Sequence, residues 1–192
     1  MNTSEHAREL IKQISLGEDS ILELKNIEYA SNAVSGPHRN SMADEMAAMA
    51  NSHGGTIVLG VDDKSHKITG LPPEKLDLTE IWVRDIASNL VNPPLDYRIR
   101  KLSVAPDGQS EKNIIRIDIP KSIFVHKRPG GYFCRRGNSK REMASDVLAR
   151  LFQQRTQNRL IRFDEQNGND SEGGCFGSKT VGTFQNTAFS AG

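Results

Sequence analysis

The segment 39–61 constrains the fold most strongly, because it leads from an amphipathic helix directly into a buried strand. Within residues 39–52, apolar side chains recur at helical spacing, at Met42, Met46, Met49 and Ala50. Gly54-Gly55 ends the predicted helix, since glycine tolerates the left-handed conformation that is common at helix ends. Residues 56–61 form an apolar, β-branched run that predicts a buried strand. These neighbouring elements indicate a fold that combines helices with a sheet.

The remaining pattern predicts an α+β fold, with a mixed β-sheet and flanking helices in a single lobe. The expected helices are 5–13, 39–52, 78–91 and 145–154, and the expected strands are 21–25, 56–61, 66–69, 97–104, 113–119 and 131–136. Residues 30–37 are expected to form a loop, because they are rich in Ser, Asn and Gly. Thr79 is the expected cap of the third helix, which Asn92-Pro93-Pro94 stops. Alternation in 113–119 predicts one strand face made of Ile115, Ile117 and Ile119.

Length and composition indicate one domain with a tail. The chain has 192 residues, enough to bury a single core. We expect an N-terminal helix in residues 1–15, a domain in 16–160 and a flexible tail in 161–192, where Gly, Asn, Ser and Thr dominate. No apolar run reaches the roughly 20 residues of a membrane helix, so no membrane partner is expected, and the polar start lacks a secretory segment. Two cysteines, Cys134 and Cys175, are too few for a disulfide framework or a four-cysteine zinc site, so we expect a cytoplasmic protein.

Positive charge is concentrated in residues 121–162, although the net charge of the whole chain is only +1. This segment carries eleven Lys and Arg residues against two acids, a net charge of +9, so the rest of the chain sums to −8. If the basic residues fold onto one face, they attract a polyanion such as nucleic acid. The alternatives are a solvated helix face and a patch that the acidic remainder neutralises.

Three carboxylates are candidates for a metal site. Glu18 and Glu23 flank the start of the first expected strand, and Asp63 follows the buried strand. If the two strands are neighbours, these acids converge at the sheet edge, where their mutual repulsion requires a divalent cation such as Mg²⁺ or Mn²⁺. Such a metal activates water and stabilises a scissile phosphate, and Lys25, about 6.5–7 Å from Glu23 along the strand, would stabilise the developing charge. The alternative is that both glutamates are ordinary surface acids and that Asp63 is a turn residue.

A second candidate site is the basic and aromatic segment 127–141. Basic residues interleave there with aromatic ones, as phosphate contact and base stacking require. Arg135 and Arg136 must face opposite sides of a strand, so only one of them can serve a groove. The expected nucleic-acid contacts are Lys127, Arg128, Tyr132, Arg135, Arg136, Lys140 and Arg141. The alternative is that Tyr132 or Phe133 belongs to the core.

A third candidate is the segment 51–55, Asn-Ser-His-Gly-Gly, whose backbone N–H groups could hold a phosphate. The segment lacks the Lys-Ser/Thr of a P-loop, and its glycines follow a helix instead of preceding one. We therefore favour a helix C-cap, which leaves ATP binding by a Walker mechanism unsupported.

Taken in order along the chain, these motifs resemble the Schlafen AlbA-type domain family. The matching segments are Glu18-x4-Glu23-Leu24-Lys25, the run 49–64 with its Gly54-Gly55 and Asp62-Asp63 pairs, Ile68-Thr69-Gly70-Leu71, Asn92-Pro93-Pro94 and the run from Tyr132 to Ser139. The resemblance spans about residues 16–155 and implies an α+β, Schlafen-core-like lobe.

The resemblance also implies an activity, a metal-dependent endoribonuclease that cuts structured RNA, with tRNA as the expected substrate. Its three-carboxylate active site would correspond to Glu18, Glu23 and Asp63 in this chain. Animal Schlafens join two such lobes around a groove, so a chain with one lobe is expected to form a homodimer. Two alternatives stay open: a non-catalytic module that binds RNA or DNA, and a nucleotide-binding regulator of the same fold.

Overall fold

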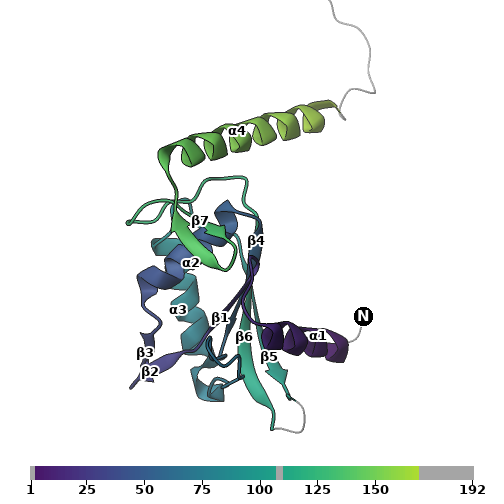
Figure 1. The fold of residues 1–192 in the computed structure, drawn as a ribbon, viewed down its shortest axis with the longest axis vertical. Helices are drawn as coiled ribbons and strands as arrows, with labels where there is room; N and C mark the ends of the chain where they lie inside the picture. Colours follow the sequence, from purple (N-terminus) through teal and green to yellow (C-terminus); the bar gives the residue numbers. More distant parts are fainter. Residues whose placement is uncertain (1–2, 107–109, 169–192) are drawn as a thin grey trace, which may run out of the picture.

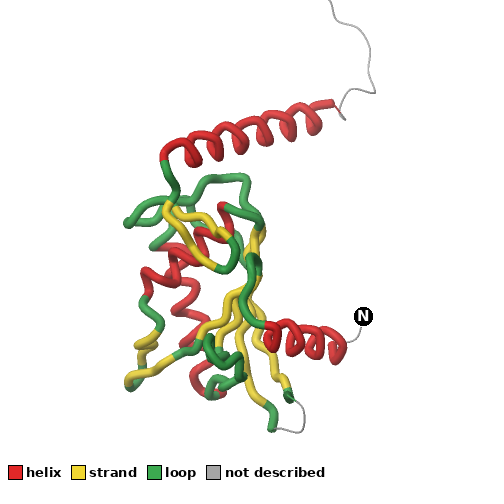
Figure 2. Tube along the Cα trace, in the orientation of Figure 1, coloured by secondary structure: helices red, strands yellow, loops and turns green. Residues whose placement is uncertain are grey.

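The computed structural model describes residues 3–106 and 110–168, which build a sheet with helices on both faces (Figure 1, Figure 2). The helices are α1 (Thr3–Leu16), α2 (Arg39–Asn51), α3 (Leu76–Asn89) and α4 (Ser145–Gly168), with a short 3₁₀ helix at Pro73–Lys75. The strands are β1 (Leu22–Lys25), β2 (Glu28–Ala30), β3 (Ala33–Gly36), β4 (Gly54–Leu59), β5 (Arg98–Val104), β6 (Lys112–Pro120), β7 (Phe133–Arg136) and β8 (Ser139–Glu142). The predicted α+β class with a mixed sheet is confirmed.

Strands β1 and β4 are neighbours in the main sheet, as the carboxylate hypothesis requires. The strand order is β1-β4-β6-β5, with β1 parallel to β4 and the other pairs antiparallel. The parallel register pairs Glu23 with Ile57 and Lys25 with Leu59. Because β1 is an edge strand, its outer backbone groups need partners from outside the sheet.

Each face of the sheet has its own hydrophobic core. Helices α2 and α3 cover one face, where Ile115, Ile117 and Ile119 are buried together, as the alternation predicts. Helix α1 covers part of the other face through Leu10 and Ile14. The two cores make β4 and β6 buried on both sides, which explains why residues 56–61 form a continuous apolar run.

Helix α2 is enclosed by the rest of the domain. Every residue from Met42 to Asn51 is buried, because the sheet, α3 and β7 pack around this helix. A helix in such a position must neutralise any charge that it carries, since an unpaired buried charge is costly. Asp44 and Glu45 are neutralised by Arg128 and Arg135 from the later part of the chain.

The structure corrects the prediction of a loop at residues 30–37. Strands β2 and β3 form a hairpin there, and the hydroxyl group of Tyr29 lies 2.7 Å from that of Thr79 on α3. The two strands are three and four residues long and include a register shift. Strands this short and irregular carry too little alternation to be recognised in the sequence.

Two further details of the prediction are wrong. Thr79 is not a helix cap, because α3 begins at Leu76 and the buried Thr79 hydroxyl donates to a carbonyl one turn earlier. Residues 66–69 do not form a strand, since only a single bridge joins Ile68 to Val61.

Helix α4 lies across the end of the domain near β7 and continues beyond it (Figure 1). The helix ends at Gly168, well past the predicted end at residue 154. Residues 161–168, which were expected to belong to the tail, are therefore helical. The rest of that tail, residues 169–192, lies outside the described residues. Among the helices of residues 3–106 and 110–168, none is both long and apolar enough to span a membrane.

Candidate functional site

Glu18, Glu23 and Lys25 lie together at the outer edge of β1. Glu18 precedes the strand, and its carboxylate accepts a hydrogen bond from the backbone N–H of Leu24 at 3.0 Å. The Glu23 carboxylate lies 2.5 Å from Nζ of Lys25, so the predicted position of these two side chains on one face is confirmed. Glu18 thereby satisfies a backbone donor on the open side of an edge strand.

Arg135 of β7 connects this cluster to α2. Its guanidinium lies 2.7 Å from the carboxylate of Glu23 and 3.0 Å from that of Glu45, and donates to the carbonyl of Asp19 at 2.8 Å. The Arg135 side chain is only 1% exposed. Charges withdrawn from water to this extent are tolerated only when each has a partner. Arg135 therefore ties β1, α2 and β7 into one buried ion network.

The environment changes the protonation of Glu18 in particular. Its pKa is raised, chiefly because burial disfavours the charged form. The hydrogen bond from the Leu24 N–H opposes this rise, and the negative charge of Glu23 adds to it. The positive charges of Lys25 and Arg135 lower the pKa, but not enough to cancel the rise. Burial by itself lowers the pKa of Lys25, but the hydrogen bond and charge of Glu23, together with the charges of Glu18 and Glu45, outweigh that effect, so the pKa is raised. The cluster thus places a carboxyl group that holds its proton more tightly than usual beside a fixed ammonium.

Asp63, the third predicted metal ligand, is exposed in the turn that follows β4. In the described part of the chain, no hydrogen bond or ion pair joins Asp63 to Glu18 or Glu23, and no three Asp, Glu, His or Cys side chains are placed to hold a metal together. Glu23 is already bound by Lys25 and Arg135. The residues as arranged do not form a ready site for Mg²⁺ or Mn²⁺, and the metal site stays a prediction.

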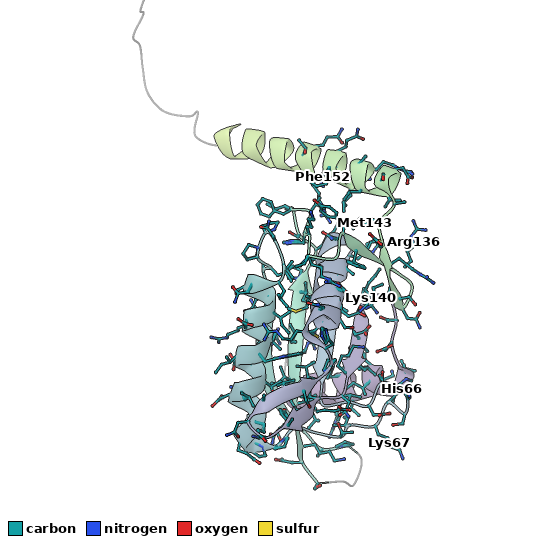
Figure 3. All side chains as sticks on the ribbon, turned by 90° about the vertical axis from the view of Figure 1, so that its left-hand side faces the viewer. His66, Lys67, Arg136, Lys140, Met143 and Phe152 are labelled. Atoms are coloured by element: carbon teal, nitrogen blue, oxygen red, sulfur yellow. The ribbon has the colours of Figure 1, made fainter. Side chains whose placement is uncertain are left out.

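Strands β7 and β8 form a hairpin that distributes its cations over two faces. Arg135 is buried and Arg136 is exposed, which confirms the predicted alternation. Arg141 shares a face with Arg136, because its register partner is Cys134, two residues from Arg136. Within residues 3–106 and 110–168 neither Arg136 nor Arg141 has an ion-pair partner, and Arg136 lies on the outer side of the hairpin (Figure 3).

A groove of about 340 Å³ separates this outer face of the hairpin from α4. Cys134 and Arg136 line it from β7, and Arg150 lines it from α4. The exposed Arg150 is paired with Asp146, one turn away on the same helix, at 2.6 Å. A groove with two guanidinium groups and one nearby carboxylate is suited to an anion.

The inner face of the hairpin region is neutralised within the protein. Arg128 pairs with Asp44, and Nζ of Lys140 lies 3.2 Å from the carboxylate of Glu45. Together with Arg135, these are three of the predicted nucleic-acid contacts, and acids of α2 and β1 occupy them. The positive charge of residues 121–162 is therefore reduced by the acidic remainder of the chain, one of the alternatives considered from the sequence.

The predicted contacts that remain accessible are Lys127, Tyr132, Arg136 and Arg141. Nζ of Lys127 lies 5.7 Å from the centre of the Tyr132 ring, within the range of a cation–π interaction. Tyr132 also packs edge-to-face on Phe152 of α4, with ring centres 6.0 Å apart. The half-buried Tyr132 thus has a packing role beside any role in binding.

The favoured interpretation of segment 51–55 as a helix end is confirmed at Ser52, which caps α2, but Gly54-Gly55 does not end the helix, because both glycines already belong to β4. The backbone N–H of Ser52 donates to the carbonyls of Ala48 and Met49. Gly54 has a φ of +82°, and a Cβ there would lie 2.7 Å from the carbonyl oxygen of Ile119. Glycine is needed because the start of β4 approaches β6 closely in a left-handed conformation.

The sequence analysis missed Glu45 and the structural role of Asn51, which it named only as part of segment 51–55. Asn51 is 3% exposed, donates to the carbonyls of His126 and Phe133, and accepts from the His126 N–H, at 2.8–2.9 Å. These bonds fix the loop that leads into β7. The signal in the sequence was the position of both polar residues inside a run of Met and Ala, since buried polar groups require partners.

The chain matches a known protein family over about two thirds of its length. The family described as Schlafen, AlbA_2 matches residues 18–144, which include the carboxylate cluster and the β7–β8 hairpin. No curated protein matches the chain. A similar solved structure is that of the DIP2311 protein from Corynebacterium diphtheriae, which is 18% identical, with a TM-score of 0.47. That match covers 72% of this chain and 26% of the other, so this chain spans about a quarter of that protein. On the strength of the family match, the chain belongs to the Schlafen AlbA_2 family.

Proposed function

We propose that this domain binds nucleic acid, with RNA as the main partner, through the outer face of the β7–β8 hairpin and the groove beside α4. The observation that carries the proposal is the pair Arg136 and Arg141, exposed on one face with no ion-pair partner in the described chain. The forked donors of guanidinium groups match phosphate oxygens. Membership of the Schlafen AlbA_2 family, a nucleic-acid-binding family, supports the same function.

The exposed side chains favour binding to the nucleic-acid backbone. Arginine and lysine donors bind phosphates, and such interactions position a nucleic acid without reading its sequence. We therefore expect binding that weakens strongly with salt and depends little on sequence.

Filter binding of labelled total tRNA over a series of salt concentrations tests this proposal. For Arg136→Ala/Arg141→Ala, the slope of log K against log [salt] should become shallower by about 0.7–0.9 for each phosphate that the variant no longer binds. Arg84→Ala is the control, since Arg84 is an exposed arginine of α3 that pairs with Glu80. A double variant with the slope of the wild type, or wild-type binding that ignores salt, would overturn the proposal.

The carboxylate cluster favours a second candidate function, the metal-dependent cleavage of RNA. The specific observation is Glu18, half-buried with a raised pKa beside Glu23 and Lys25. In this proposal Glu18, Glu23 and Asp63 hold Mg²⁺ or Mn²⁺, Lys25 stabilises the negative charge that develops on the phosphate, and tRNA is the substrate. The ion network around Glu23 argues for binding without cleavage, so this candidate ranks second.

A cleavage assay separates the two candidates. Labelled total tRNA is incubated with the protein and Mn²⁺, Mg²⁺ or EDTA, beside a Glu18→Ala/Glu23→Ala/Asp63→Ala variant. Discrete fragments that require metal and disappear with the variant would support the nuclease and its site. Intact tRNA under every condition would leave binding as the function of the domain.

A second copy of the chain is proposed to complete the nucleic-acid groove. Light scattering of the purified protein with and without tRNA measures the oligomeric state. A monomer under both conditions would overturn the homodimer.

A further inference from the structure

The sheet face that α1 shares carries arginines that the proposed function does not use. Helix α1 covers this face around Val58 and Ile114, and no described helix lies over the part between α1 and α4 (Figure 1). Strands β5 and β6 bring three arginines to that uncovered part. We name it the open arginine face, and its members are Arg98, Arg100 and Arg116.

The strand register places these side chains on one face. Arg98 lies opposite Asp118, and Arg100 lies opposite Arg116, in the antiparallel pair of β5 and β6. Directly opposed residues of neighbouring strands share a face, with Cβ atoms about 5 Å apart. Arg116 in turn lies opposite Val58 of β4, which belongs to the core beneath α1, so this is the face on the α1 side.

The open arginine face has more positive charge than its acid can neutralise. Arg100 and Arg116 form a like-charge pair across two strands, an arrangement that destabilises a sheet unless it is compensated. The Asp118 carboxylate lies 2.7 Å from Nε of Arg116 and 3.4 Å from the guanidinium of Arg100. Arg98 is exposed and has no ion-pair partner within residues 3–106 and 110–168. Two guanidinium groups therefore share one carboxylate, and that of Arg98 stays unpaired in the described chain.

Asp118 orients the arginines and leaves donors for a ligand. Arg116 uses its Nε on Asp118, and neither of its Nη groups has a partner in the described part of the chain. The side chain of Arg100 is 45% exposed. Residues two apart on a strand are separated by about 7 Å. This separation is less than the Debye length of about 8 Å at physiological salt, so salt screens the arginines only partly from one another. Their electrostatic potentials therefore add at the surface.

The open arginine face continues toward the hairpin that the proposed function uses. Strand β6 ends at Pro120, and the exposed Lys121 follows directly. The chain then passes Lys127, whose backbone forms two hydrogen bonds with Asn92, and enters β7. Exposed cations thus follow the same end of the sheet from β5 to the hairpin.

We propose that the open arginine face is a second phosphate-binding surface, which binds the backbone of the same nucleic-acid chain as the β7–β8 hairpin. The inference rests on the proposed function and extends its binding surface to the opposite side of the sheet. Charge complementarity selects the occupant, because three guanidinium groups on one face, with a single carboxylate that pairs with two of them, suit a polyanion.

The test is the salt dependence of tRNA binding by Arg98→Ala/Arg100→Ala, which changes two exposed side chains on an edge strand. The slope of log K against log [salt] should become shallower by about 1.4–1.8, because two phosphates are no longer neutralised. This change should add to that of Arg136→Ala/Arg141→Ala. The matched control is Lys101→Ala, on the same strand but on the opposite face, where Lys101 pairs with Asp77 and Glu80 of α3.

The outcomes distinguish this inference from the proposed function. A wild-type slope for Arg98→Ala/Arg100→Ala, with a shallower slope for the hairpin variant, overturns the inference and retains the proposed function. The reverse result supports the open arginine face and removes the hairpin from the binding surface. The slope change for Lys101→Ala is compared with half of the slope change for Arg98→Ala/Arg100→Ala, which is the change per residue. If the two are equal, the loss of net charge alone explains the effect, and the inference is overturned. Salt-independent binding by the wild type overturns both.

Discussion

Replacement of Arg135 by methionine tests the buried ion network that holds β1, α2 and β7 together. Methionine keeps much of the side-chain volume but leaves Glu23 and Glu45 in the interior without their shared guanidinium. Removing one partner of a buried ion pair costs about 3–5 kcal/mol. Lys25, 2.5 Å from Glu23, and Lys140, 3.2 Å from Glu45, remain as partners. We therefore expect a loss at the lower end of that range, about 3 kcal/mol in the free energy of unfolding.

Urea unfolding followed by the fluorescence of Trp82 measures this loss, because Trp82 is the single tryptophan and its side chain on α3 is buried in the core between the sheet, α2 and α3. The matched control is Arg136→Met, the next residue on the opposite face, with an expected change within about 0.5 kcal/mol. Adding Glu23→Gln to Arg135→Met should restore part of the stability, since it removes a buried charge that has lost one of its two cationic partners. A loss below about 1 kcal/mol for Arg135→Met would refute the reasoning, because only a solvent-screened ion pair contributes so little.

Three other predictions test separate parts of the structure. The pKa of Glu18 is raised in the folded state above its ordinary value of 4.5. Protonated Glu18 therefore favours the folded state at pH values below 4.5, and this stabilisation is lost as the pH rises through the folded-state pKa. Glu18→Gln should therefore gain Tm relative to the wild type as pH rises from about 4 to 7, and a constant difference in Tm would contradict this. Asn51→Ala leaves buried backbone groups of the loop before β7 unpaired and should lower the free energy of unfolding in urea by about 2–4 kcal/mol. A decrease below about 1 kcal/mol would show that these hydrogen bonds contribute little to stability. Gly54→Ala should lower Tm more than Gly137→Ala, because a Cβ meets backbone only 2.7 Å away at Gly54 and nothing within 4 Å at Gly137, although φ is positive at both. Equal shifts in Tm would show that backbone strain alone decides the cost.

The exposed arginines of this protein illustrate why a basic segment of sequence is not a basic surface. Residues 121–162 have a net charge of +9, yet Arg128, Arg135 and Lys140 are paired with acids of α2 and β1. The open arginine face, by contrast, belongs to strands outside that segment. Local charge counts could not find it, because its arginines come from two strands and meet only through their register.

The sequence by itself determined the elements whose signals are local. Apolar spacing predicted α2, the β-branched run predicted β4, and the alternation in β6 predicted which isoleucines are buried together. The opposite orientations of Arg135 and Arg136 also followed from strand geometry alone. The short strands β2, β3 and β8 carried no comparable pattern, so the sequence did not reveal them.

Only the tertiary structure decided which charged groups are free to act. Arg135 is buried because Glu23 and Glu45 lie beside it, and these partners are 112 and 90 residues away in the chain. The same ion pairs occupy Glu23, and the turn after β4 leaves Asp63 exposed and without a bond to Glu18 or Glu23 among the described residues. Burial and pairing arise from interactions between distant segments, so no local pattern of residues can determine them.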